Sequence, residues 1–178
     1  MKVIETKLND CLIIQPEKFS DERGYFLETY QELRYKNILS KNDHFVQDNL
    51  SRSKQGVLRG LHFQKRKPQG KLVRVSQGEV FDVAVDLRSE SSTFGQWFGV
   101  ILNDSDHNQL WIPPGFAHGF LVLSELADFE YKCTEYYDPD DEEVLVWNDP
   151  QISISWPLDN PIVSNKDRKG YLLKDLVR

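Results

Sequence analysis

From about residue 45 onward, the chain is divided into short segments in which apolar and polar residues alternate. Val73 and Val75 alternate with polar neighbours up to the turn at Gln77-Gly78, and a second alternating segment fills residues 81–87. Alternation with a period of two places successive side chains on opposite faces of a strand. Many short strands separated by turns predict an all-β fold, a sandwich or a jelly-roll barrel, with no strand order implied.

The later strands and one helix can be placed by the same patterns. A helix is predicted over residues 28–40, where Tyr30, Leu33 and Leu39 recur at near-helical spacing among charged neighbours. There is no internal repeat, low-complexity tract or linker, so residues 1–178 are expected to form a single domain. Further strands are expected over residues 96–102, 108–112, 117–123, 128–134, 143–147 and 151–156.

Composition excludes several classes of protein. A chain of 178 residues with 39% hydrophobic and 28% charged residues can bury one core. No apolar run approaches the ~20 residues of a membrane span, and the N-terminus lacks a secretory pattern, so a cytoplasmic protein without a membrane partner is expected. A net charge of −6 gives no reason to expect nucleic acid as a partner. Cys11 and Cys133 are too few for a disulfide framework and are expected to be reduced, partly buried thiols.

Three segments concentrate functional side chains: residues 47–74, 111–120 and 131–137, with Lys166-Asp167 near the C-terminus. The first two resemble the paired motifs of cupins, since Gly56 precedes His62 by six residues and Pro113-x-Gly115-x-x-His118 follows. Cupins typically hold a metal through two His and a Glu of the first motif and a His of the second.

Two substitutions argue against a metal site in this cupin-like pattern. Gln64 stands at the second His position, and Lys71 stands where the metal-binding pattern has its Glu. A Lys ammonium has no lone pair to donate and repels a dication, and two His without a carboxylate make a poor metal site. We therefore predict neither a metal nor another cofactor.

A cavity that holds His, Lys, Tyr and Arg side chains suits a carbonyl substrate. A His oriented by a carboxylate can remove the proton beside the carbonyl, and a cation at the oxygen stabilises the enolate. A Tyr on the opposite face can return a proton to the same carbon and so invert it. These groups predict the chemistry of a ketosugar epimerase.

The order and spacing of longer strings resemble one family over nearly the whole chain. The strings DERGYFLE, QDNLSRS, GVLRGLHFQ, KLVRVSQGEVFDVAVDLR, WIPPGFAHGF, YKCTEYYDP and NKDRKG resemble the dTDP-4-dehydrorhamnose 3,5-epimerases from about Val3 to Leu173. This resemblance implies a cupin-type jelly-roll β-barrel with a few short peripheral helices, and a homodimer that exchanges N-terminal strands. It also implies inversion at C3 and C5 of dTDP-4-dehydro-6-deoxy-D-glucose, giving dTDP-4-dehydro-L-rhamnose for dTDP-L-rhamnose biosynthesis.

The resemblance also implies a role for individual residues. His62 would be the general base, Asp167 the carboxylate that orients it, and Tyr131 the general acid. Lys71 would stabilise the enolate oxygen and contact the substrate. The remaining pocket residues would be Arg23, Phe26, Glu28, Gln47, Asn49, Arg59, His118 and Tyr137.

Structural roles compete with these functional ones at several positions. His118 could instead cap the Pro-Pro-Gly turn, and Tyr131, on one strand face with Phe129 and Cys133, could be a core aromatic. Tyr137 could close a strand end and Arg23 could form a surface ion pair, whereas Arg59, as a buried Arg in need of a partner, suits a diphosphate. The two remaining histidines, His44 and His107, lie in polar loops and are expected to be solvated.

Other functions use related chemistry. An epimerase acting only at C3 or only at C5 of a related sugar is a close alternative, and a 3,4-ketoisomerase is a more distant one. A sugar-binding cupin without activity is a third alternative, although it has no need of the matched base and acid. Storage cupins usually carry two tandem barrels and this chain has one, which excludes that class.

Overall fold

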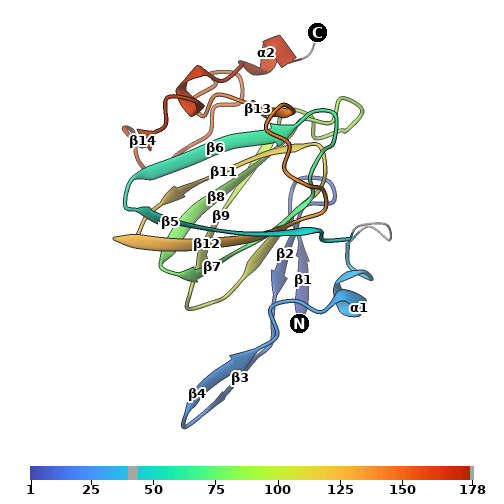
Figure 1. The fold of residues 1–178 in the computed structure, drawn as a ribbon, viewed down its shortest axis with the longest axis vertical. Helices are drawn as coiled ribbons and strands as arrows, with labels where there is room; N and C mark the ends of the chain where they lie inside the picture. The colour runs from blue at the N-terminus through green and yellow to red at the C-terminus, as the bar shows by residue number, and fades with distance from the viewer. Residues whose placement is uncertain (40–43, 177–178) are drawn as a thin grey trace.

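The fold is a jelly roll of two β-sheets that face each other (Figure 1). The structure is a computed structural model that describes residues 1–39 and 44–176. The first sheet has the order β1 (Lys2–Glu5), β2 (Leu12–Gln15), β10 (Gln109–Ile112), β7 (Lys71–Gln77), β12 (Leu126–Cys133) and β5 (Gln47–Lys54). The second has the order β13 (Glu142–Val144), β6 (Val57–Gln64), β11 (Phe116–Val122), β8 (Glu79–Asp86) and β9 (Trp97–Asn103), with β14 (Ile162–Val163) parallel to β6. The all-β, cupin-type prediction is confirmed.

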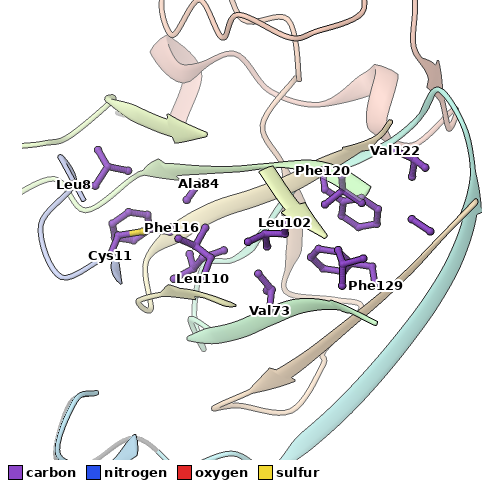
Figure 2. Close-up of a cluster of buried hydrophobic side chains, with 14 residues drawn as sticks. Leu8, Cys11, Val73, Ala84, Leu102, Leu110, Phe116, Phe120, Val122 and Phe129 are labelled. Carbon is purple, nitrogen blue, oxygen red and sulfur yellow. The ribbon is translucent and has the colours of Figure 1, made fainter. Parts of the chain in front are cut away.

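The main hydrophobic core fills the space between the two sheets, as Figure 2 shows. Its apolar side chains come from alternate positions of the central strands, such as Val73 on β7, Phe120 on β11 and Phe129 on β12. The rings of Phe120 and Phe129 stack with centroids 4.0 Å apart. This packing holds the two sheets at a fixed separation, so side chains that project between them are rigidly placed.

The outer face of the second sheet is also buried, because the C-terminal part of the chain lies across it (Figure 1). Val83 and Val85 on β8 pack there against Ile152 and Leu173. Strands that are apolar on both faces require cover on both sides. This cover also carries the 3-10 helix η1 (Asp167–Lys169) back onto β6.

The strand predicted over residues 151–156 was wrong. Asp149 is buried, and its carboxylate accepts hydrogen bonds from the backbone N–H groups of Gln151 and Ile152 at 2.8 and 2.9 Å. The Asp149 carboxylate also accepts the N–H of Leu173 at 2.8 Å, at the start of helix α2 (Leu173–Leu176). The N–H groups of Gln151 and Ile152 are thus satisfied within a turn and have no need of a strand partner.

The helix predicted over residues 28–40 shortens to one turn, α1 (Glu32–Tyr35). The helix begins only after Thr29, whose carbonyl accepts hydrogen bonds from Gln109 Nε2 at 2.7 Å and from the Tyr35 hydroxyl at 3.2 Å. Residue 40 lies outside the described residues. No helix within residues 1–39 and 44–176 is long and apolar enough to cross a membrane.

The residues before position 45 also contain strands that the alternation pattern did not predict. β1 and β2 extend the first sheet beside β10. The next two strands, β3 (Lys18–Asp21) and β4 (Gly24–Leu27), form a separate hairpin, which Figure 1 shows extending below both sheets. Every residue of β3 is exposed, so this hairpin has no core of its own.

Strands β6 and β11 approach unusually closely at a pair of glycines. A Cβ atom built on Gly60 would lie 2.6 Å from the Gly119 Cα, so no side chain fits there. The strand register shifts at this point, and the next paired residues are His62 and His118. The close contact therefore places two histidines opposite each other on neighbouring strands of the second sheet.

Candidate active site

A cavity of about 340 Å³ opens between the two sheets and collects most of the predicted site residues. Both sheets contribute inward-facing side chains, as expected for a ligand site in a small β-sandwich. The predicted residues that line the cavity are Gln47, Asn49, Arg59, His62, Lys71, His118, Tyr131 and Tyr137. Asp167 stands directly behind one of them.

His62 projects from β6 and is held by Asp167, a residue singled out only by resemblance. Its Nε2 lies 2.7 Å from Asp167 Oδ1. Burial alone would raise the pKa of the Asp167 carboxyl, but the bond and charge of His62 and the N–H of Gly60 outweigh it and lower that pKa. An ionised carboxylate only accepts hydrogen bonds, so His62 carries its hydrogen on Nε2 and keeps the lone pair of Nδ1 for use as a base.

A second carboxylate, Glu142, lies on the other side of the His62 ring. Glu142 Oε1 is 3.8 Å from His62 Nδ1, and its Oε2 accepts a hydrogen bond from the Tyr137 hydroxyl at 3.1 Å and pairs with Lys166. The sequence did not single out Glu142 or Lys166 as site residues. Glu142 sits in the acidic run Asp140–Glu143, and nothing in that run indicates which carboxylate faces inward.

Lys71 projects from β7 into the same cavity and is almost fully buried, with 7% of its surface exposed. Its Nζ makes one hydrogen bond among the described residues, to the carbonyl oxygen of His62 at 3.5 Å. Burial lowers the pKa of the Lys71 ammonium, and the nearby Cys133, Glu142 and Asp82 oppose that effect. Such a buried cation can stabilise a negative charge that develops on a substrate oxygen.

Tyr131 lines the cavity from β12, in the sheet opposite His62. Burial raises the pKa of its phenol to about 12, so the group carries its proton at neutral pH. The Tyr131 ring also packs against the core, where its centroid lies 6.0 Å from that of Phe129, so Tyr131 contacts both the core and the cavity. Cys133, on the same face, is a free thiol, as is Cys11, and both are fully buried where partial burial was expected.

His118 faces the cavity from β11 and does not cap the Pro-Pro-Gly turn. Its Nε2 lies 2.9 Å from Oδ2 of Asp82, which is fully buried on β8. Burial lowers the pKa of the His118 imidazole even though Asp82 raises it. The site thus contains two His–carboxylate pairs on neighbouring strands, and only the first was expected.

Gln64 lies beside the cavity and serves the surrounding loops. Its amide donates hydrogen bonds to the carbonyls of Lys67 at 2.8 Å and Tyr136 at 3.2 Å, and its Oε1 accepts the N–H of Asp138 at 2.8 Å. Within residues 1–39 and 44–176, no three His, Cys, Asp or Glu side chains are grouped so that they could hold a metal ion.

Arg59 was expected to be buried but is exposed, at the mouth of the cavity. Its Nε donates to Ser53 Oγ at 2.9 Å, a neutral partner that leaves the charge free for an anion. Nearby, Gln47 Nε2 donates to Asn49 Oδ1 at 2.9 Å, and Gln47 Oε1 accepts the N–H of Tyr137 at 2.9 Å. Tyr137 therefore belongs to the rim of the site.

Three predicted residues lie on or just after the hairpin of β3 and β4 and outside this cavity. Arg23 is paired with Asp21 and its side chain is 85% exposed, while 69% of Phe26 is exposed. Glu28 pairs with Arg34 at 3.1 Å. The surface ion pair foreseen for Arg23 is therefore formed, and within one chain these residues do not reach the other site residues.

The expectation of a solvated His107 was wrong, whereas His44 is exposed as predicted. His107 is 6% exposed because Tyr25 of the hairpin covers it, with ring centroids 5.0 Å apart. A prediction from local polarity could not include this contact, which comes from a segment 82 positions earlier in the sequence.

Comparisons with known proteins agree with this geometry. The family model described as dTDP-4-dehydrorhamnose 3,5-epimerase matches residues 5–175. A protein of that name from Salmonella typhimurium is 54% identical over 97% of this chain and 96% of its own. The crystal structure of dTDP-6-deoxy-D-glucose-3,5-epimerase from Legionella pneumophila, in complex with dTDP-4-keto-L-rhamnose, superposes with a TM-score of 0.94 and 54% identity, covering 97% of this chain and 93% of that one.

A more distant structure has the same architecture. The 3′-monoepimerase from Streptomyces bikiniensis, in complex with dTDP-quinovose, has a TM-score of 0.88 and 28% identity, covering 95% of this chain and 86% of that one. The full-length match, the two facing sheets and the cavity between them lead to one conclusion. The chain is a member of the dTDP-4-dehydrorhamnose 3,5-epimerase family of isomerases.

Proposed function

We propose that this protein inverts C3 and C5 of dTDP-4-dehydro-6-deoxy-D-glucose to give dTDP-4-dehydro-L-rhamnose, acting in the cytoplasm in dTDP-L-rhamnose biosynthesis. One observation carries the proposal. His62 and Tyr131 project into one cavity from opposite sheets, and Lys71 lies in the same cavity. A base and an acid on opposite faces of a sugar ring are the arrangement that inversion of a carbon requires.

In each inversion His62 Nδ1 takes the proton from the carbon beside the C4 ketone. The electron pair of the broken C–H bond forms the enolate, and the charge that reaches the C4 oxygen is stabilised by the ammonium of Lys71. The Tyr131 hydroxyl then donates its proton to the opposite face of the same carbon as the ketone re-forms. The imidazolium formed on His62 is stabilised by Asp167 at 2.7 Å and by Glu142 at 3.8 Å.

The nucleotide would bind at the rim of the cavity. Arg59 offers a charged fork for the diphosphate, and the exposed ring of Tyr137 offers a stacking surface for the base. No cofactor takes part, because each step moves only a proton between a side chain and the sugar. Asn49 and Gln47 supply amide groups for the sugar hydroxyls.

We further propose that each single-domain chain works in a homodimer, with the hairpin of β3 and β4 as the exchanged segment. β1 and β2 pair within their own sheet, and Arg88 ties the turn between them to the body by a 2.8 Å bond to Asp10. The hairpin contacts the body through a 3.1 Å bond from Lys18 to the carbonyl of Ser105 and through Tyr25 against His107, and it exposes Phe19, Phe26 and Arg23. In a dimer, these residues would enter the cavity of the second copy, whereas they lie outside the cavity of their own chain.

Proton NMR in D2O tests the reaction directly. Purified protein is treated with a chelator and mixed with the dTDP-4-keto-6-deoxy sugar, and deuterium is followed at each carbon. Label at both C3 and C5, unaffected by the chelator, is expected. Label at one carbon alone would indicate a mono-epimerase, and no label would favour a different substrate or a binding protein.

A further inference from the structure

We infer that Asp82 is a positioning residue of this active site, acting on the reaction through His118 and Lys71. It was predicted only as one polar member of an alternating strand, and its side chain has no place among the groups that contact the sugar. The inference rests on the proposed function for its kinetic consequence, whereas its electrostatic consequence can be measured without a substrate.

The environment of Asp82 is unusual for a carboxylate. The residue is 0% exposed on the inner face of β8, among apolar neighbours such as Val80 and Ala84. Oδ2 lies 2.9 Å from His118 Nε2, while Oδ1 is buried and has no hydrogen-bond partner among the described residues. A buried, half-satisfied carboxylate is destabilising, so packing gives no reason for an acid at this position.

The first effect of Asp82 is to fix the state of His118. An ionised carboxylate accepts the Nε2 hydrogen, so the neutral ring must present a bare lone pair at Nδ1. The ring lies nearly parallel to Phe129, at 23° and a centroid distance of 5.7 Å, which limits its rotation. His118 lines the cavity, so Asp82 makes it a hydrogen-bond acceptor toward the sugar.

The second effect of Asp82 is to support the charge of Lys71, which lines the same cavity as His118, the residue that Asp82 contacts at 2.9 Å. Burial lowers the pKa of that ammonium, and the groups that oppose this are Cys133 on β12, Glu142 on β13 and Asp82 on β8. Two further titratable residues lie near the Lys71 ammonium. His62 on β6 accepts a hydrogen bond from Nζ at its backbone carbonyl, and His118 on β11 has a pKa that the charge of Lys71 helps to lower. Glu142 is already paired with Lys166, which leaves Asp82 as the buried carboxylate without a cationic partner of its own.

Both effects serve the same step. A neutral Lys71 could not stabilise the enolate oxygen as an ammonium does, and a His118 with its hydrogen on Nδ1 would become a donor where an acceptor is required. Asp82→Asn keeps the shape of the side chain, removes its charge and replaces one acceptor oxygen with an amide donor. It therefore separates the electrostatic role from the packing of β8.

The test compares wild type with Asp82→Asn in two measurements. In the substrate-free protein, the 13C shift of Lys71 Cε is titrated by NMR, with the resonance assigned through Lys71→Met. We expect the midpoint of the titration to fall by about one pH unit, equivalent to a tenfold change in proton affinity. With the dTDP-sugar, we expect kcat to fall about tenfold and the alkaline limb of the kcat profile to move to lower pH.

Two further variants distinguish positioning from general loss of structure. Asp86→Asn is a matched control, since Asp86 is equally buried on the same face of β8 but bonds to Arg88, Ser91 and Thr93. It should lower thermal stability and leave both the Lys71 titration and the kcat profile unchanged. Asp82→Asn combined with His118→Gln should lose less than the sum of the two single losses, because the two residues act as a pair.

An unchanged Lys71 midpoint together with an unchanged kcat profile in folded Asp82→Asn would overturn the inference. If that variant does not fold, the double variant, which retains two amides able to bond to each other, is titrated instead, and a wild-type midpoint there has the same meaning. If wild type itself fails to turn over the sugar, the proposed function fails, while the Lys71 titration still decides the role of Asp82.

Discussion

The interior of the sandwich and the hairpin of β3 and β4 hold the predicted site residues under opposite conditions. Inside, His62 and Lys71 project from the packed strands β6 and β7, and Asp167 projects from η1, which contacts β6. On the hairpin, the side chain of Arg23 is 85% exposed and the residue Phe26 is 69% exposed. The proposed base, acid and cation therefore lie within one chain, whereas the predicted binding residues of the hairpin lie outside its cavity.

The two regions hold their side chains in position by different means. The interior positions are enforced by packing, because a displaced strand would lose core contacts on both faces. The hairpin position is enforced by little more than the contact of Tyr25 with His107 and a 3.1 Å bond from Lys18 to the carbonyl of Ser105. Substitutions in the interior should therefore change turnover, and those on the hairpin should change affinity.

The largest expected effect is that of His62→Ala, which removes the base. Turnover should fall by between about a hundredfold and ten-thousandfold, the contribution of a well-placed acid–base group. The affinity for dTDP, measured by calorimetry, should be nearly unchanged, because Arg59 and the rim residues remain. A parallel loss of dTDP affinity would show that His62 binds rather than catalyses and would break the contrast between interior and hairpin.

Tyr131→Phe should have the next largest effect, on one half of the reaction. Inversion should slow by about a hundredfold, while exchange of the substrate proton with solvent, which needs only His62 and Lys71, should slow much less. NMR in D2O follows both processes in one sample. Equal slowing of exchange and inversion would assign the acid role to another group.

Arg23→Ala tests the hairpin and should raise KM about tenfold with little change in kcat, as for the loss of one bond to a charged group. A sharper test co-expresses the Arg23→Ala chain with a His62→Ala chain. If the hairpins are exchanged, each mixed dimer contains one site with both substitutions and one site with neither. Roughly a quarter of wild-type activity should then return at low substrate concentration. If each hairpin serves its own chain, no mixed dimer has an intact site and no activity returns.

The smallest effects concern stability, and they again differ between the two regions. Burial raises the pKa of Asp86, but bonds from Arg88, Ser91 and Thr93 lower it below the usual 3.8. A depressed pKa stabilises the fold above the unfolded-state value, and this contribution is lost as pH falls through the folded-state value. Asp86→Asn should therefore lower stability at pH 7 by about 1–3 kcal/mol, and by less below about pH 4, in urea titrations.

The equivalent change on the hairpin is Asp21→Asn, which breaks the ion pair with Arg23. Both partners are exposed to solvent, so their attraction is screened. The thermal midpoint should not change measurably at any pH between 4 and 8. A clear drop would mean that the hairpin is part of the cooperative fold and that the two regions differ less than their exposure indicates.

The sequence predicted those site residues that stand out by type and spacing within a single strand. Alternating apolar and polar residues mark the strands of a sandwich, so the sequence predicted the strands. On those strands the spacing of His62 and His118 and the unusual Lys71 could be recognised. Asp167 came only from resemblance, since it lies 105 positions from His62 in a run of charged residues. Contacts between distant segments carry no local signal.

Asp82 and Glu142 were missed for a related reason. An alternating strand with Asp82 between Phe81 and Val83 suggests that the acid faces water, but the C-terminal cover buries the apolar side and leaves the acid facing the interior. Glu142 could not be distinguished from its acidic neighbours. The strand expected at 151–156 failed because a single carboxylate, that of Asp149, satisfied the backbone locally.

Gln64 has a consequence for how such an enzyme can change over evolutionary time. In cupins that bind metal, a His at this position would be a ligand, and one substitution would seem to restore it. Here the amide of Gln64 joins three loop positions, at Lys67, Tyr136 and Asp138. An imidazole cannot make all three bonds, so Gln64→His would weaken the contacts between these loops and lower stability, while Lys71 would still repel a metal ion.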